Sequence, residues 1–260
     1  MSAAGMGARL VFPVMGTVSS ISVPECELVR IGGDMVREAL RAARLELERM
    51  DLRFSHYRTD SDISRWVAGE DIDDAAAADI EHVLRECGRL HRESNGVFRA
   101  LNPRTNALDT AGYVKGYAIR RASDELRRHG LASFAVGVGG DAAFAGRPDD
   151  ARPWQVAVQD PGRRFAVVAV IPVVDGAVAT SGTAERGEHI WLGAGQVPDA
   201  GLRSFTVTGP DIAEADAYAT VGFAMGEAGM EWVGAHPGYR SLIVRTDGTV
   251  RSDAALVLAA

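Results

Sequence analysis

Apolar residues recur at helical spacing along much of the first half of the chain. Between Asp34 and Arg53 they recur every three or four residues, with charged residues between them. This spacing predicts an amphipathic helix with one buried face. Ser61 to Trp66 is a predicted short helical turn, which Asp60 or Ser61 would cap. Three further helices are predicted at Ala75 to Ser94, Thr110 to His129 and Ile212 to Met225.

Short runs of β-branched and aromatic residues, separated by Gly, Pro and Asp, predict strands. Ala8 to Val23 alternates in part and is interrupted at Gly16, which predicts a pair of strands. Asp247-Gly248 is a strong turn signal and predicts a hairpin of Ser241 to Arg245 with Thr249 to Ser252. The remaining predicted strands are Phe134 to Val138, Trp154 to Gln159, Ala166 to Val170, Val178 to Thr180 and Ser204 to Thr208.

The order of these elements bears on the fold class. Helices and strands do not alternate regularly, and several strands follow one another in the second half. This order favours an α+β fold over a doubly wound parallel sheet. We find no internal repeat and no clear linker, so we predict one domain over residues 1–260.

Composition narrows the function classes. The net charge of -7 leaves no excess of Lys and Arg to neutralise phosphates, which argues against a nucleic-acid partner. Two separated cysteines, Cys26 and Cys87, form neither a zinc pattern nor a disulfide framework, so a reduced cytoplasmic setting is expected. No stretch is apolar for long enough to span a bilayer, and no signal peptide is evident near Phe12-Pro13.

Asp216 and Thr220 are four residues apart on the predicted helix 212–225, so their side chains share a face. The helix has no other charged residue from Ala217 to Met225, and a buried carboxylate needs a cation or several donors. Two hard oxygens suit Mg²⁺, which takes few protein ligands and keeps positions for phosphate and water. Spacing alone favours the simpler alternative, an exposed Asp216 near the helix start, where the helix dipole stabilises it.

The segment from Leu108 to Tyr117 surrounds another predicted helix start. Asp109 precedes the helix, and a capping role explains it by itself. Gly112 and Gly116 weaken the first two turns, which suggests that another group approaches the backbone closely. Lys115 would pair with a phosphate at this helix terminus or, alternatively, lie on the surface in water.

Other candidate sites have weaker patterns. Residues 137–141 are glycine-rich but lack the spacing of a phosphate loop, so a tight turn is favoured. Residues 179–182 contain a serine without the elbow that nucleophilic serines require. His189 is the histidine of interest, although a packed or surface position is its simplest explanation. Phe54, Tyr57 and Trp66 would stack on an aromatic ligand or pack in the core.

Taken in order, these segments resemble the ApbE family, the FAD:protein FMN transferases. Met15-Gly16-Thr17 is similar to the family's MGT, and residues 54–64 resemble its FSxYxxxSxIS segment. Asp109 to Tyr117 is similar to the motif D-x-G-x-x-KGYA. Further matches, in family order, are Gly139-Gly140-Asp141, Pro153-Trp154, Asp160-Pro161, Ala179-Thr180-Ser181-Gly182, His189-Ile190 and the helix from Asp216 to Gly226.

The resemblance implies a fold and a set of site residues. The implied fold is related to T-folds, with antiparallel or mixed sheets, flanking helices and FAD in a cleft between two halves. The implied metal is Mg²⁺, held by the side chains of Asp216 and Thr220 and by the backbone carbonyl of Gly112. Asp216 and His189 are the candidates for deprotonating the incoming hydroxyl. The residues implied to contact FAD are Met15, Tyr57, Asp109, Lys115 and, in the segment after His189, Trp191.

The chain also departs from the family pattern. The Asp-Pro of the family segment H-x-x-D-P-x-T-G is lost in residues 189–195. Ala219 stands where some members have a second acidic residue beside the metal threonine. The segment between Gly96 and Asp109 lacks a longer insert that helps bind flavin in other members.

The activity that the resemblance implies is transfer of the FMN moiety of FAD to a Ser or Thr hydroxyl of an acceptor flavoprotein, with release of AMP. Two alternatives remain open on sequence grounds. One is a Mg²⁺-dependent FAD pyrophosphatase, in which water replaces the protein hydroxyl. The other is a non-catalytic FAD-binding protein, which the altered segment at His189 and the alanine at 219 would favour.

Overall fold

The computed structural model describes residues 7–102, 107–149, 151–163, 165–182 and 201–256, and its centre is an eight-stranded sheet. The strand order is β1-β2-β3-β4-β7-β8-β9-β10, and every neighbouring pair is antiparallel. The strands are β1 (Ala8–Val14), β2 (Thr17–Val23), β3 (Phe134–Val138), β4 (Asp141–Ala145), β7 (Gly176–Gly182), β8 (Leu202–Gly209), β9 (Arg240–Arg245) and β10 (Val250–Ser252).

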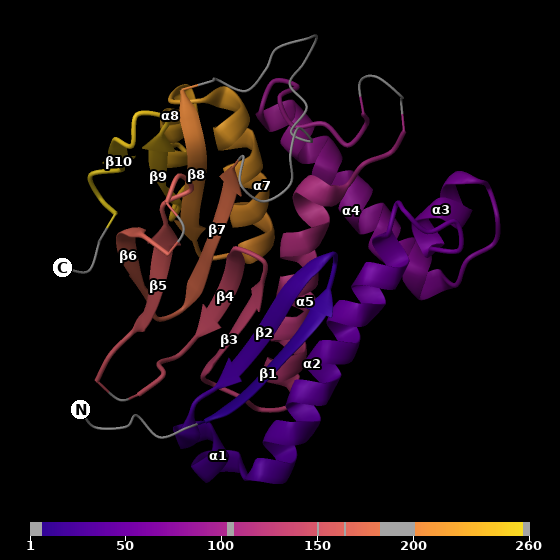
Figure 1. The fold of residues 1–260 in the computed structure, drawn as a ribbon. Helices are drawn as coiled ribbons and strands as arrows, with labels where there is room; N and C mark the ends of the chain where they lie inside the picture. The colour runs from indigo at the N-terminus through magenta and orange to yellow at the C-terminus, as the bar shows by residue number, and fades with distance from the viewer. Residues whose placement is uncertain (1–6, 103–106, 150, 164, 183–200, 257–260) are drawn as a thin grey trace.

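Helices cover one face of this sheet (Figure 1). α2 (Gly33–Phe54) packs on α5 (Ala111–Arg128), and α5 packs in turn on α7 (Ile212–Met225), which lies against β7 and β8. Together they bury the larger of two apolar clusters against the sheet. The other helices within the described residues are α1 (Glu25–Ile31), α3 (Asp62–Val67), α4 (Asp74–Glu93) and α8 (Ala228–Gly234).

The opposite face of the sheet is covered by a two-stranded hairpin of β5 (Trp154–Gln159) and β6 (Val167–Val173). Neighbouring residues of a strand point to opposite faces. Phe144 of β4 therefore packs under the hairpin, whereas Ala143 and Ala145 face the helices. The sheet is thus buried on both sides near its middle.

The structure confirms the α+β class with antiparallel sheets and flanking helices. The long predicted helices are present to within about one residue at each end, and Ser61, rather than Asp60, caps the short α3 by accepting the Ser64 N–H at 3.2 Å. The predicted hairpin of β9 and β10 is also present, with Gly248 at φ 86°.

Three short elements of the described part of the chain were not predicted from the sequence: α1, β4 and α8. β4 is the clearest case, because its sequence Asp-Ala-Ala-Phe-Ala is poor in β-branched residues. Such a segment has little preference for a strand by itself. Pairing with β3 on one side and β7 on the other makes it one.

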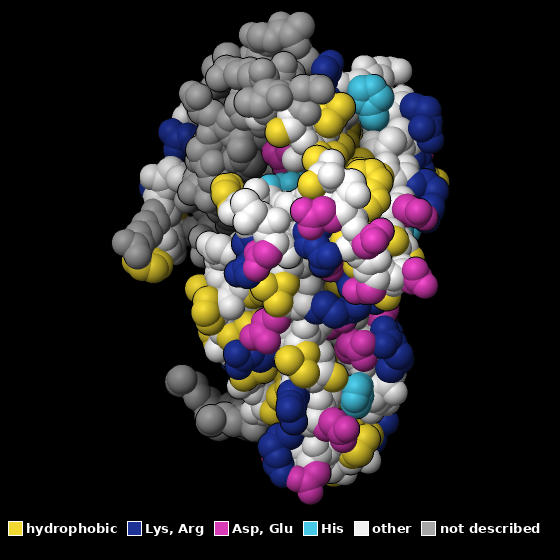
Figure 2. Space-filling view, turned by 90° about the vertical axis from the view of Figure 1, so that its right-hand side faces the viewer, with side chains coloured by type: hydrophobic (Ala, Val, Ile, Leu, Met, Phe, Trp, Pro, Cys, Tyr) yellow, Lys and Arg dark blue, Asp and Glu magenta, His cyan; other side chains and the backbone are white. Residues whose placement is uncertain are grey.

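Acidic and basic side chains are intermixed over the face that contains α2, α3 and α4 (Figure 2). Many are paired along one helix, such as Arg44 with Glu48 and Arg89 with Glu93. Neither sign of charge dominates this face. Within the described ranges, no helix combines the length and the apolar composition that crossing a membrane requires.

Candidate active site

One end of the sheet gathers most of the residues singled out in the sequence. The β1–β2 turn at Met15-Gly16 and the β3–β4 turn at Gly139-Gly140 lie side by side there, since the Gly139 N–H donates to the Val18 carbonyl at 3.0 Å. β7 also ends at this end of the sheet, because it pairs antiparallel with β4, which begins there. The first turns of α5 reach this end, where residues of α7 meet them.

Asp216 lies on the buried side of α7 and is 2% exposed. The alternative of an exposed carboxylate near the helix start is therefore wrong. Asp216 Oδ2 accepts the Gly116 N–H of α5 at 2.8 Å. A Cβ added at Gly116 would lie 2.6 Å from the Ile212 carbonyl oxygen, so the close approach expected at this glycine is confirmed.

Lys115 provides the positive charge beside Asp216. Its Nζ lies 3.5 Å from Asp216 Oδ1 and 2.5 Å from Oδ2 of Asp141, the first residue of β4. The lysine side chain is 18% exposed and Asp141 is 1% exposed. Lys115 is therefore not a solvated surface lysine, but one cation shared by two buried carboxylates.

The surroundings of Asp216 change its protonation. Burial raises the pKa of Asp216 to about 7, the positive charge of Lys115 opposes that rise, and the negative charge of Asp141 adds to it. A carboxylate in this state binds a proton readily near neutral pH, and a cation placed beside it would favour the ionised form.

Thr220 lies one turn beyond Asp216 on α7. Thr220 Oγ1 is 3.3 Å from Ser181 Oγ of β7, and a Cβ added at Gly112 would lie 3.5 Å from Thr220 Cγ2. The first turn of α5 therefore packs directly against Thr220. The structure brings Gly112, Asp216 and Thr220 together between α5 and α7.

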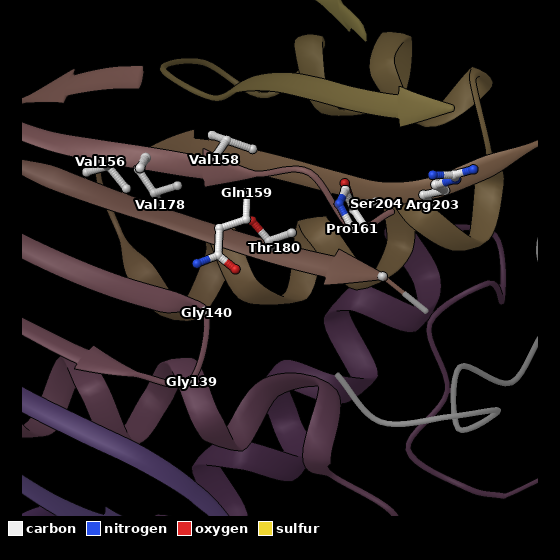
Figure 3. A pocket seen from close by; sticks show the side chains of 12 residues that line it. Gly139, Gly140, Val156, Val158, Gln159, Pro161, Val178, Thr180, Arg203 and Ser204 are labelled. Carbon is white, nitrogen blue, oxygen red and sulfur yellow. The ribbon is translucent and has the colours of Figure 1, made fainter. Parts of the chain in front are cut away.

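A cavity of about 450 Å³ lies between the sheet and the β5–β6 hairpin and reaches the same end of the sheet at Gly139, Gly140 and Gly182. Figure 3 shows Val156 and Val178 at one end, Arg203 at the other, and Gln159 and Thr180 between them. The glycines of the β3–β4 turn also line the cavity. Thr180 joins the cavity to the carboxylates, because its backbone N–H donates to Asp141 Oδ1 at 2.8 Å.

Asp109 lies at the start of α5, where its Oδ1 accepts the Ala111 N–H at 3.0 Å. The residue at the N-cap position of α5 is Thr110, so Asp109 is not the cap expected from the sequence, although it accepts an N–H of the first turn from one residue earlier. His56 approaches the same turn, because its Nε2 accepts the Thr110 N–H at 3.3 Å. Desolvation lowers the pKa of His56, and the nearby charge of Asp109 opposes that effect. A neutral imidazole fits a nitrogen that accepts a hydrogen bond.

The other predicted FAD contacts differ in their surroundings. Met15 has φ 51°, and its N–H donates to Asp51 Oδ2 of α2 at 3.1 Å, which fixes the β1–β2 turn. Tyr57 is 100% exposed and follows the end of α2. His189 and Trp191 lie outside the described residues. The FAD-binding roles of Met15, Tyr57, Asp109, Lys115 and Trp191 remain predictions.

The sequence predicted no role for Asp141 beyond a tight turn. The turn is confirmed at Gly139, with φ 61°, but Asp141 also forms the closer of the two ion pairs of Lys115. A charged residue directly after a Gly-Gly turn at the end of a buried strand was the available signal. Its lysine partner is 26 residues away in sequence, so only the fold brings the two together.

The raised pKa of Asp216 predicts a pH-dependent stability. An unfolded aspartic acid ionises near pH 4, whereas the folded carboxyl keeps its proton to about pH 7. Raising the pH between these values favours the unfolded chain. We expect Asp216→Asn to gain about 2–4 kcal/mol over the wild type at pH 8, and little at pH 4. Urea unfolding in EDTA at both pH values measures the difference, and an equal gain at both would contradict the assignment.

Comparison with known proteins identifies the family. The family model described as ApbE matches residues 15–102 and 99–243 of the chain, which is most of its length. The chain belongs to the ApbE family. The second matched segment contains Lys115, Asp141 and Asp216 of the cluster described above, and the first begins at Met15 of the β1–β2 turn.

Curated ApbE relatives match part of the chain. It is 31% identical over 158 residues to the FAD:protein FMN transferase of Rhodobacter capsulatus, an alignment that covers 57% of this chain and 30% of that protein. It is 31% identical over 123 residues to the FAD:protein FMN transferase of Salmonella typhimurium, covering 44% of this chain and 35% of the relative. The alignments thus span about a third of these relatives.

Solved ApbE structures share the fold over nearly the whole chain. The ApbE protein of Thermotoga maritima superposes with a TM-score of 0.78 at 21% identity, covering 95% of this chain and 97% of that one. The flavin transferase ApbE of Vibrio cholerae gives a TM-score of 0.73 at 20% identity, with the same coverage of both chains. At these identities the likeness concerns the fold.

Proposed function

We propose that this protein transfers the FMN moiety of FAD to a Ser or Thr hydroxyl of an acceptor flavoprotein, in a Mg²⁺-dependent reaction that releases AMP. The observation on which we base this is the buried Asp216, which lies between the Gly116 N–H and Lys115 with Thr220 one turn away. Curated relatives of the chain are named FAD:protein FMN transferases, which supports the same activity.

The chemistry of the donors fits Mg²⁺. Asp216 offers a buried carboxylate, Thr220 a hydroxyl and Gly112 a backbone carbonyl, and all three are hard oxygen ligands. Burial leaves the Asp216 carboxylate in need of positive charge, since Lys115 approaches it only to 3.5 Å. When bound, Mg²⁺ would neutralise charge on the pyrophosphate of FAD.

Residues of the chain would position the two reactants. The hydroxyl oxygen of the acceptor attacks the FMN-side phosphorus, and the bond from that phosphorus to the bridging oxygen breaks. AMP leaves with the bonding electron pair. Such a displacement depends mainly on alignment and charge neutralisation. The Lys115 ammonium supplies positive charge at the cluster beside the cavity, and ionised Asp216 or His189 accepts the hydroxyl proton.

FAD itself would occupy the end of the sheet where the Met15-Gly16 and Gly139-Gly140 turns meet. The adjoining cavity has apolar walls from Val156 and Val178 and polar groups from Gln159 and Arg203. Such a mixture suits a ligand with both rings and phosphates. The cleft between two halves, the acceptor motif and the cytoplasmic location stay predictions.

The test is incubation of the purified protein with FAD and Mg²⁺, with and without an acceptor flavoprotein domain that presents a Ser or Thr. AMP and FMN are followed by chromatography, and the acceptor by intact mass. We expect AMP together with an acceptor heavier by one FMN unit. AMP with free FMN and an unmodified acceptor would instead identify a pyrophosphatase. FAD that binds but stays intact with every metal would identify a binding protein.

A further inference from the structure

Lys115 is the only lysine in the chain, although Lys and Arg together number 28. Every other basic position is an arginine. The two side chains differ physically, because guanidinium is a broad planar fork and ammonium is a compact point charge. The space between two buried carboxylates suits the compact group. This single exception lies in the cluster described above.

A backbone hydrogen bond orients the Asp141 side chain independently of Lys115. Its Oδ1 accepts the Thr180 N–H of the neighbouring strand at 2.8 Å, and its side chain is almost fully buried. Its Oδ2 is thereby aimed at Lys115 Nζ, at 2.5 Å. Asp216 Oδ1 is a full ångström farther from the same nitrogen, at 3.5 Å. The lysine is therefore held unequally, closer to β4 than to α7.

We propose that Asp141 is a positioning residue, which holds the Lys115 ammonium away from Asp216 and so keeps the Asp216 carboxylate open to a metal cation. This inference rests on the proposed function, since it assigns Asp216 to the metal. With Asp141, Lys115 and Asp216 all ionised, the three side chains sum to one negative charge. This net negative charge favours binding of a divalent cation while the Lys115 ammonium stays in place.

The consequence of losing Asp141 follows from the same distances. Without the closer carboxylate, the ammonium would keep Asp216, at 3.5 Å, as an acidic partner. A close Lys115–Asp216 pair would then compete with the metal for the same oxygen. Asp141 would therefore affect metal affinity mainly through Lys115, and only weakly as a distant negative charge.

A double-mutant cycle separates these two routes. Asp141→Asn keeps an oxygen to accept the Thr180 N–H, so the strand contact survives. We expect it to weaken Mn²⁺ binding, measured by electron paramagnetic resonance, about tenfold or more. In a Lys115→Met background the same change should cost about threefold or less. An equal loss in both backgrounds would overturn the proposal.

A matched control is available in the bend between β6 and β7. Asp175 also accepts a backbone N–H, from Gly146 at 3.0 Å, and follows β6 outside the cluster. Asp175→Asn removes the same charge and should leave Mn²⁺ affinity unchanged. Circular dichroism of each variant shows whether it is folded.

The single lysine provides a second measurement that does not depend on metal. Protein labelled with ¹⁵N-lysine has one side-chain ammonium, so its Nζ resonance in nuclear magnetic resonance reports on Lys115 alone. We expect Asp141→Asn to shift this resonance in metal-free protein, whereas Asp175→Asn leaves it in place. An Nζ signal that Asp141→Asn leaves unchanged would overturn the proposal. A wild type that binds neither Mn²⁺ nor Mg²⁺ would instead contradict the metal site of the proposed function.

Discussion

Asp216→Asn is expected to lower Mg²⁺-dependent release of AMP from FAD by at least about 10³-fold, which corresponds to roughly 4 kcal/mol of activation free energy. The amide keeps an oxygen for the Gly116 N–H but lacks the negative charge that the metal requires. The measurement is initial AMP formation at saturating FAD over a range of Mg²⁺ concentrations. Some FAD binding should remain, because three of the predicted FAD contacts, Met15, Tyr57 and Asp109, are unchanged.

Asp211→Asn is the matched control for this experiment. Asp211 is the N-cap of the same helix, where its Oδ1 accepts the N–H groups of Ala213 and Glu214. Asparagine caps helices about as well as aspartate. The control therefore makes the same chemical change on α7 and should keep most of the activity. Full Mg²⁺-dependent turnover in Asp216→Asn would remove the metal assignment.

Gly116→Ala is expected to destabilise the fold by about 3 kcal/mol, because the added methyl group meets backbone rather than a movable side chain. The new Cβ would lie 2.6 Å from the Ile212 carbonyl oxygen and 2.8 Å from the Ala213 Cα. α5 and α7 must separate to admit it, which also stretches the Gly116–Asp216 hydrogen bond. Thermal unfolding should show a Tm lower by about 6–12 °C.

Gly88→Ala, in another helix, is expected to stabilise the fold instead. Gly88 lies inside α4, where an added Cβ meets only the end of the Arg92 side chain, at 3.6 Å. Alanine is preferred over glycine in a helix interior, so a gain of about 0.5–1 kcal/mol is expected. A Gly116→Ala protein as stable as the wild type would mean that the two helices tolerate a wider separation.

Local sequence patterns were sufficient for much of the fold. The helical repeat of apolar residues predicted α2, α4, α5 and α7 because each has one face on the core. The Asp247-Gly248 turn predicted the last hairpin because its backbone requires a positive φ. β4 escaped prediction, since its alanines form a strand only between two partners.

For the candidate site, too, some features follow from the sequence and others only from the fold. The sequence by itself determined that Asp216 and Thr220 share a helix face, and it indicated a close neighbour at Gly116. It assigned the cap of α5 to Asp109, whereas the N-cap residue is Thr110. It left open whether Asp216 is buried and whether Lys115 lies on the surface. Those questions depend on residues distant in the chain, and the antiparallel sheet decided them.

Only the tertiary structure brought Asp141 to Lys115 and Ser181 to Thr220. The burial of a side chain and the charges beside it depend on residues that packing brings near it. The spacing of residues along one helix does not predict them. The physical reason is that a carboxylate changes its pKa and its partners when water is removed. The sequence therefore determined which side chains are available at this end of the sheet, and the fold decided which of them act on one another.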